Sequence, residues 1–264
     1  MHTPRKRFGQ NFLVDHLIIR EIIANVQAIP GQHIIEIGPG QGALTKGLIA
    51  SGAQIDAIEL DRDLAARLTE EYANKANFTL HSADILKFDL AALYANNPQQ
   101  KLRLVGNLPY NISSPLLFKL FDNIGCIYDM HFMLQREVAE RLTATPGTKQ
   151  YGRMSVMAQY YCYMQIVLDV PPASFDPAPK VDSSVVYFKP HVKPDTVVQS
   201  SRILQQITTQ AFGQRRKTIT NSLHSLITAQ ELQNLEINPM LRAENLTLAD
   251  YVRIANYAAT KSNK

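Results

Sequence analysis

The sequence contains no long hydrophobic run. None of its segments approaches the roughly 18 consecutive apolar residues that a membrane-spanning helix requires. The basic start MHTPRKRFGQ is followed by NFLVDH, which is not the apolar core of a secretory signal. We therefore expect a cytoplasmic protein that does not interact with a membrane.

Cysteine and metal-binding patterns are equally scarce. The chain has two cysteines, Cys126 and Cys162, without a CxxC pair, and its seven histidines show neither HExxH nor HxxxH spacing. These absences argue against a disulfide framework and against a structural zinc site. We expect both cysteines to be small apolar packing residues, and we expect no metal.

Basic charge is concentrated toward the end of the chain. Residues 1–190 contain 18 Lys and Arg against 18 Asp and Glu, whereas residues 191–264 contain 9 against 5. A basic cluster is often only a solvated face, but two clusters flanking a neutral body favour nucleic acid, because Lys and Arg neutralise phosphates. The candidate RNA-binding residues are Arg5, Lys6, Arg7, Arg215, Arg216 and Lys217.

The first part of the chain alternates between β-rich runs and helical patterns. Such alternation predicts a parallel sheet with crossover helices. Helices are expected at 16–28, 43–50, 61–72, from 113 onward and at 136–143. Strands are expected at 33–37, 53–60, 77–84, 102–105 and 127–135.

The pattern changes after residue 150. A helical segment at 154–161 precedes two β runs, 165–172 and 183–190, which we expect to extend the sheet edge in antiparallel fashion. From about residue 198 only helical patterns appear, and Thr247 and Asp250 have the spacing of a capping box. We expect an α/β domain over 1–190, a linker over 191–197 and a helical domain over 198–264.

A glycine-rich segment, EIGPGQG at 36–42, follows the first predicted strand. Its glycines let the backbone approach a ligand and turn into a helix. The spacing is GxGxG, which is neither the GxGxxG of dinucleotide loops nor a P-loop. An acid placed just before the glycines also argues against a phosphate ligand. A plain turn from strand to helix is the alternative.

Two further acids follow the next two strands. Glu59 can accept hydrogen bonds from both hydroxyls of a ribose, and Asp84 can accept one from an adenine amino group. Each acid alone is more often a cap or a surface charge. Together with Gly38, they would line one crevice at the carboxyl edge of the sheet, where open α/β folds bind ligands. The set favours S-adenosylmethionine, a nucleoside that carries an amino-acid tail and no phosphate.

The segment GNLPY at 106–110 ends the fourth predicted strand beside that crevice. The Asn107 side-chain oxygen and a backbone carbonyl at Leu108–Pro109 can accept the two hydrogens of an adenine amine. Its lone pair would then face the donor methyl group, which is a gain in proximity and orientation. Tyr110 would stack on a base that has left its own stack. Phe175, held between prolines, is the expected second aromatic wall.

Eight longer motifs are distributed along the chain between residues 5 and 223. They are RKRFGQNFL (5–13), EIGPGQGALT (36–45), IELDRDLAARL (58–68), GNLPYNISSPL (106–116), FMLQREVAERL (132–142), YGRMSVMAQYY (151–161), FDPAPKVDSSV (175–185) and FGQRRKTITNSL (212–223). Together they resemble the ribosomal RNA adenine dimethyltransferase family, most closely its bacterial small-subunit branch. The resemblance implies a Rossmann-like class I S-adenosylmethionine-dependent methyltransferase sheet with a small all-helical C-terminal domain.

The resemblance also implies an activity: transfer of four methyl groups to the N6 atoms of two adjacent adenosines. They lie in the loop of the hairpin near the 3′ end of 16S rRNA, and the reaction occurs late in assembly of the 30S subunit. A monomer is expected, with its helical domain engaging the ribosome. By motif position, the residues in contact with S-adenosylmethionine are Asn11, Leu13, Gly38, Glu59, Asp84 and Asn107. The catalytic residues are Asn107, Leu108, Pro109 and Tyr110, which clamp the acceptor, and Phe175, which faces the target base.

Three alternatives remain. The 23S rRNA adenine N6-methyltransferases of the antibiotic-resistance type share the glycine and NLPY motifs. An NAD-dependent oxidoreductase could use Glu59 for the ribose, although the GxGxG spacing and the lack of a hydride-transfer constellation count against it. An RNA-binding assembly factor with a vestigial site is the third, and the intact motifs count against it.

Overall fold

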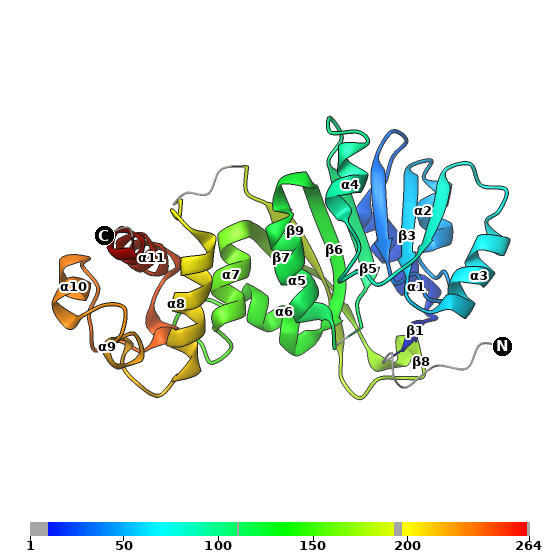
Figure 1. Ribbon diagram of the computed structural model, residues 1–264. Coiled ribbons are helices and arrows are strands. Elements are labelled where there is room, and N and C mark those ends of the chain that lie inside the picture. Colours follow the sequence, from blue (N-terminus) through cyan, green and yellow to red (C-terminus); the bar gives the residue numbers. More distant parts are fainter. Residues whose placement is uncertain (1–9, 110, 193–196, 263–264) are drawn as a thin grey trace. The chain divides into compact units, whose positions relative to one another are not determined.

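The computed structural model describes residues 10–109, 111–192 and 197–262 (Figure 1). Its main sheet has seven strands in the order β4-β3-β2-β5-β6-β9-β7. A separate pair is formed by β1 (Phe12–Leu13) and β8 (Phe175–Asp176). The strands of the main sheet are β2 (His33–Ile37), β3 (Gln54–Glu59), β4 (Phe78–Ser82), β5 (Leu102–Asn107), β6 (Ile127–Gln135), β7 (Cys162–Val170) and β9 (Ser183–Pro190).

The five strands from β4 to β6 run parallel, and β9 pairs antiparallel with β6. This arrangement confirms the predicted parallel sheet with an antiparallel addition. Strands such as β2 and β5 are buried along almost their whole length, because both faces of a parallel sheet are covered by helices. The carboxyl ends of the parallel strands therefore meet at one edge of the sheet.

Most helices up to residue 161 follow the predicted alternation, but α4 lies where the sequence predicted no helix. Asp61 caps α3 by accepting a hydrogen bond from the Asp63 amide at 3.0 Å. The core between sheet and helices contains the fully buried Val26, Ile34 and Leu48. The helices are α1 (His16–Val26), α2 (Thr45–Ala50), α3 (Arg62–Glu71), α4 (Leu90–Ala95), α5 (Ser113–Asp122), α6 (Arg136–Thr143) and α7 (Arg153–Tyr161).

The chain forms two compact units. The first comprises Met1–Ala139 and Met164–Pro190, and the second comprises Glu140–Tyr163 and His191–Lys264. The second unit thus includes a segment that the sequence boundary near 190–197 assigns to the first domain. The division into an α/β domain, a linker and a helical domain stays a prediction.

The second unit has an aromatic centre. The rings of Tyr151 and Tyr251 pack on Phe212 with centroid separations of 6.1 and 5.8 Å. The Thr247 and Asp250 capping box is present, with the Thr247 amide donating to Asp250 at 2.8 Å. Besides α7, the unit contains the helices predicted beyond residue 198: α8 (Ser201–Gly213), α9 (Ile219–Ser222), α10 (Ala229–Asn234) and α11 (Leu248–Ser262). None of the helices in the described ranges combines the length and apolar character needed to cross a membrane.

Candidate functional site

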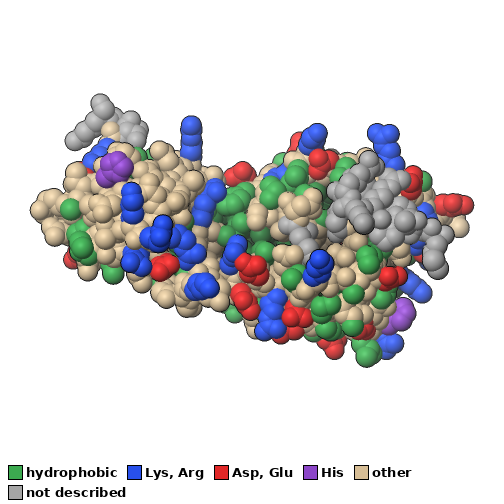
Figure 2. Space-filling model, turned by 90° about the horizontal axis from the view of Figure 1, so that it is seen from below, with side chains coloured by type: hydrophobic (Ala, Val, Ile, Leu, Met, Phe, Trp, Pro, Cys, Tyr) green, Lys and Arg blue, Asp and Glu red, His purple; other side chains and the backbone are tan. Residues whose placement is uncertain are grey.

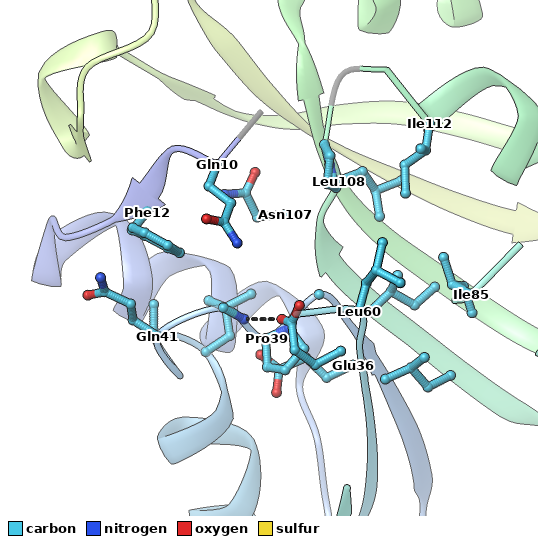
Figure 3. Close-up of a pocket in the computed structure, with 18 of the residues that line it drawn as sticks. Gln10, Phe12, Glu36, Pro39, Gln41, Leu60, Ile85, Asn107, Leu108 and Ile112 are labelled. Carbon is cyan, nitrogen blue, oxygen red and sulfur yellow. Dashed lines mark hydrogen bonds between the residues drawn. The ribbon is translucent and has the colours of Figure 1, made fainter. Parts of the chain in front are cut away.

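A cavity of about 210 Å³ lies where the carboxyl ends of β2, β3 and β5 meet the loop after β4 (Figure 3). The structure brings eight predicted site residues to its lining, and their roles stay predictions. Tyr110 lies outside the described residues. The eight are Asn11, Leu13, Gly38, Glu59, Asp84, Asn107, Leu108 and Pro109.

The glycine loop is fixed to the end of the neighbouring strand. Gly40 has a positive φ of 60°, and its N–H donates to Glu59 Oε2 at 3.0 Å. A Cβ at Gly40 would lie 3.3 Å from the ring of Phe12, so a side chain is disfavoured by space as well as by conformation. The Gly38 N–H donates to the Ile58 carbonyl at 2.9 Å. The loop backbone is thereby held against the cavity.

Glu59 is 6% exposed and already carries structural hydrogen bonds. Its Oε1 accepts the Asp61 N–H at 2.8 Å, while Oε2 accepts from Gly40. A carboxylate offers about four acceptor positions, so acceptor capacity remains for a ribose hydroxyl. Burial raises the pKa of Glu59, because the charged form loses water.

Glu36 is a buried acid of the cavity to which sequence reasoning gave no role. It is 2% exposed, and its Oε2 accepts no hydrogen bond from any residue that the structure describes. Burial raises the pKa of Glu36 to about 8, and the negative charge of Glu59 adds to the rise. An orphaned buried carboxyl is unfavourable until a donor enters. The sequence feature that could have indicated Glu36 was its position two residues before Gly38.

Asp84 follows β4 on a loop that a lysine anchors. Its Oδ1 accepts the Leu86 N–H at 2.9 Å, whereas no described residue donates to its Oδ2. Lys119 of α5 donates from Nζ to the carbonyls of Ile85 at 2.9 Å and Phe88 at 2.5 Å. Desolvation lowers the pKa of Lys119. Sequence reasoning missed Lys119, because nothing in the helix pattern shows which loop its side chain reaches.

Asn107 connects the cavity to the N-terminal segment. Its Nδ2 donates to the Asn11 carbonyl at 3.1 Å, so its Oδ1 is the atom left to accept. A Cβ at Gly106 would lie only 2.5 Å from the Ile37 carbonyl oxygen. Glycine at this position therefore lets β5 approach β2 and keeps Asn107 at the cavity edge. Leu108 is buried, and its N–H donates to the Met133 carbonyl at 3.1 Å.

All four residues of the segment 10–13 line the cavity. Gln10 Nε2 lies 3.4 Å from Asp61 Oδ2, and the Val14 N–H donates to the Ser174 carbonyl at 2.9 Å. Figure 3 shows Gln10, Phe12 and Asn107 on one side of the cavity, with Leu60 and Ile85 on the other. Gln10 and Phe12 were not predicted as lining residues, because a two-residue strand has no periodicity to recognise.

Phe175 does not line this cavity. It is 5% exposed and lies in β8 opposite Leu13 of β1, within the hydrophobic core. Its predicted position facing the target base would require the ring to leave that core. The role of Phe175 stays a prediction.

The candidate RNA-binding residues have different environments. Arg5, Lys6 and Arg7 lie outside the described residues. Arg215, Arg216 and Lys217 are exposed in the second unit, where Lys and Arg side chains gather on one face (Figure 2). Arg215 is already engaged: its Nη2 lies 3.0 Å from Glu244 Oε2 and donates to the carbonyls of Lys149 and Tyr151 at 2.8 and 3.1 Å.

The charge of the cavity selects among ligands. Its described lining contains three carboxyl groups and no Lys or Arg. In their ionised forms these carboxyl groups repel a ligand with phosphates and attract a sulfonium or ammonium cation, and Glu36 contributes to this charge only when it ionises. Glu36 and Glu59 offer open acceptor positions, and Leu60 and Ile85 form an apolar wall for a base. The residues present therefore fit S-adenosylmethionine. Within the described residues, no group of three or more His, Cys, Asp and Glu is arranged to hold a metal ion.

Comparison with known proteins gives a consistent result. The family model described as "Ribosomal RNA adenine dimethylase" matches residues 1–260. Two proteins named "Ribosomal RNA small subunit methyltransferase A", from Yersinia pestis (strain Pestoides F) and Yersinia pseudotuberculosis serotype O:1b (strain IP 31758), are each 51% identical over 261 residues. The match covers 99% of this chain and 96% of each relative.

Two solved structures share the fold. A dimethyladenosine transferase from Plasmodium falciparum has a TM-score of 0.80 and 24% identity, over 95% of this chain and 98% of that one. The 23S rRNA methyltransferase ErmE has a TM-score of 0.72 and 23% identity, over 94% of this chain and 100% of that one. At these identities the likeness concerns the fold alone.

Proposed function

The chain belongs to the ribosomal RNA adenine dimethylase family, and we propose that it methylates the N6 atoms of two adjacent adenosines. These adenosines lie in the loop of the hairpin near the 3′ end of 16S rRNA, and the reaction takes place late in 30S subunit assembly. The enzyme is an rRNA adenine dimethyltransferase of the class I fold, and S-adenosylmethionine is its methyl donor. The name of the Yersinia relatives supports the small subunit as target.

One observation of the structure carries the chemical part of this proposal. A cavity lined by carboxyl groups has Asn107 at its edge, with an amide oxygen left to accept. Glu59 and Asp84 suit the ribose and adenine of an adenosine, and the orphaned Glu36 suits a cationic tail. Donor and acceptor sites thus adjoin at one edge of the sheet.

Asn107 is proposed to orient the acceptor amine. When bound, S-adenosylmethionine supplies an electrophilic methyl group on a sulfonium. The Asn107 Oδ1 and a backbone carbonyl at Leu108–Pro109 accept the amine hydrogens, so the nitrogen lone pair points along the transfer direction. The bond from Asn107 Nδ2 to the Asn11 carbonyl keeps this orientation. Catalysis would then rest on proximity and alignment, and the proton of the methylated nitrogen would pass to water, so no strong general base is required.

The adenosine must leave its stack to reach this site. Tyr110 is proposed to stack on the extruded base, since base–aromatic stacking contributes about 1–3 kcal/mol per base. Phe175 would provide the opposite wall if its ring turns out of the core. We place the enzyme in the cytoplasm as a monomer acting on 30S subunits.

Transfer of radiolabelled methyl from S-adenosylmethionine tests the proposal. The acceptors are undermethylated 30S subunits, with 50S subunits for comparison, and digestion identifies the labelled nucleoside. We expect N6-dimethyladenosine in 16S rRNA alone. Label in 23S rRNA would assign the chain to the resistance type of methyltransferase. Absence of label from both, with S-adenosylmethionine still bound, would contradict the enzymatic proposal and favour an assembly factor.

A further inference from the structure

One face of α8 presents a continuous polar stripe. Its residues occur at spacings of three and four, so they share one side of the helix. Leu204, Ile207 and Ala211 on the other side are fully buried. Together with Arg153, the first residue of α7, the stripe lines a shallow cavity of about 380 Å³, here called the α7–α8 groove. The α8 residues that line it are Arg202, Gln205, Gln206, Thr209 and Gln210.

Several donors in the α7–α8 groove are unused. The side chains of Arg202, Gln205 and Gln206 make no hydrogen bond or ion pair with the residues that the structure describes. Three other cations of the same unit, in contrast, are paired with acids. Those pairs are Arg215 with Glu244 at 3.0 Å, Arg253 with Asp250 at 2.5 Å and Lys261 with Glu231 at 2.6 Å.

No Asp or Glu is among the described residues that line the α7–α8 groove. The sequence also contains none between Asp195 and Glu231. Arg153 also stands at the N-terminus of α7, where the helix dipole adds positive potential. The groove is therefore a site for an anion, built from guanidinium, amide and hydroxyl groups.

These groups match the sugar–phosphate backbone of RNA. Guanidinium groups bind phosphate oxygens, and amides and hydroxyls bind phosphates and ribose hydroxyls. The described residues that line the α7–α8 groove include no aromatic side chain, so they offer no platform on which bases could stack. The stripe from Arg202 to Gln210 extends about 12 Å along the helix, which is long enough to contact more than one nucleotide. Its chemistry thus favours the backbone over the bases.

We propose that the α7–α8 groove binds the backbone of an rRNA segment and helps to seat the enzyme on its subunit substrate. This inference rests on the proposed function and extends it to a surface separate from the basic cluster at 215–217. The contact is independent of base sequence. It contributes affinity for the subunit and leaves the affinity for S-adenosylmethionine unchanged.

The test compares two groove variants with a matched control. Gln206→Glu places a negative charge in the α7–α8 groove, and Arg202→Gln removes its uncompensated charge. Gln233→Glu makes the same chemical change at an exposed position of α10 outside the groove. Binding to 30S subunits is measured from 50 to 200 mM salt, together with the KM for subunits and for S-adenosylmethionine and with the melting temperature.

We expect both groove variants to raise the Kd for 30S subunits about three- to tenfold and Arg202→Gln to reduce the salt slope by roughly one. The melting temperature and the KM for S-adenosylmethionine should not change, and Gln233→Glu should bind like the unaltered chain. Unchanged Kd and slope in both groove variants would overturn the inference. Weaker binding with an unchanged slope would also overturn it and would indicate a protein contact. The proposed function fails separately, if the unaltered chain does not methylate 30S subunits.

Discussion

At the scale of single residues, the ionisation of Glu36 should make both stability and ligand binding depend on pH. Its pKa of about 8 in the folded chain lies above the ordinary 4.5, so the folded state binds a proton that the unfolded state releases. Stability from this group is therefore greatest at low pH and decreases by about 1.4 kcal/mol per pH unit between roughly pH 5 and 8. Glu36→Gln should remove this component, as urea unfolding at pH 5.5 and 7.5 would show.

Glu36→Gln should also bind S-adenosylmethionine more weakly, by about tenfold or more. The reason is that a neutral amide replaces the carboxylate that accepts from a cationic group. In the unaltered chain, affinity should increase with pH as Glu36 ionises. Glu70→Gln, a change at an exposed acid of α3, is the control and should alter neither property. Equal pH slopes for the Glu36→Gln variant and the unaltered chain would contradict this account.

Asn107 acts at the same scale through a single amide. Asn107→Ala removes the Oδ1 acceptor and the bond to the Asn11 carbonyl. We expect kcat for methyl transfer to fall by about 100-fold or more, while binding of S-adenosylmethionine and of 30S subunits changes little. Single-turnover methylation and filter binding measure the two effects. Normal turnover in this variant would refute the acceptor clamp.

At the scale of elements, Asp56 joins three neighbouring strands. Its carboxylate on β3 accepts from His33 of β2 and from His81 of β4, each at 2.5 Å. Burial raises the pKa of Asp56, but the hydrogen bonds and charges of the two histidines outweigh burial and lower it to about 2. Asp56 thus connects β2, β3 and β4, and the residues at or just after the carboxyl ends of these strands line the cavity described above.

This cluster predicts a specific acid sensitivity. The folded pKa of Asp56 lies below its ordinary 3.8, so its stabilisation is complete above about pH 4 and is lost as pH falls toward 2, by roughly 2 kcal/mol. Asp56→Asn should destabilise the chain by roughly 2–4 kcal/mol at neutral pH. It should also reduce the loss of stability between about pH 4 and pH 2. Circular dichroism against pH and urea unfolding measure both. Asp122→Asn, a matched change at an exposed acid, should alter neither the stability at neutral pH nor its loss in acid.

The elements show what the sequence could and could not predict. The strands β6 and β9 begin and end where predicted, because their apolar runs are bounded by local signals. The pair β1–β8 was missed, since its strands have two residues each and form only when residues 12–13 meet residues 175–176. Lys119 and the Asp56 cluster were missed for the same reason: their partners are distant in sequence and appear only after the sheet forms.

For the site, the order of glycines and acids along successive strands was enough to place Gly38, Glu59 and Asp84 around one cavity. Parallel strands must deliver their carboxyl ends to the same edge, so this grouping follows from topology. The burial of Phe175 did not follow. Its exposure depends on how β8 packs against β1 and the core, which no local pattern encodes.

At the scale of the whole molecule, the division of the chain is harder to predict than its elements. The helix α7 was expected, but its pattern does not say which core it joins. In the structure the Tyr151 ring just before it packs on Phe212, and the segment belongs to the second compact unit. We propose that residues 198–264 and this segment together form the part of the enzyme that engages the ribosome.

The three residues of the basic cluster at 215–217 should then have two different roles. Arg215 holds Glu244 and the carbonyls of Lys149 and Tyr151, whereas Arg216 and Lys217 have exposed side chains with no partner among the described residues. Arg215→Gln should lower the free energy of unfolding by about 1 kcal/mol. The double variant Arg216→Glu/Lys217→Glu should leave unfolding unchanged.

The double variant should instead weaken binding to 30S subunits by more than about tenfold and reduce the salt slope by roughly two, since two phosphate contacts are lost. Urea unfolding and salt-dependent binding, measured on both variants, separate the roles. Because Arg215 is partly neutralised by Glu244, its substitution should affect the slope less than either neighbour does. Unchanged subunit binding in the double variant would mean that Arg216 and Lys217 form only a solvated face, and the proposed contact through the α7–α8 groove would then be tested independently of this cluster.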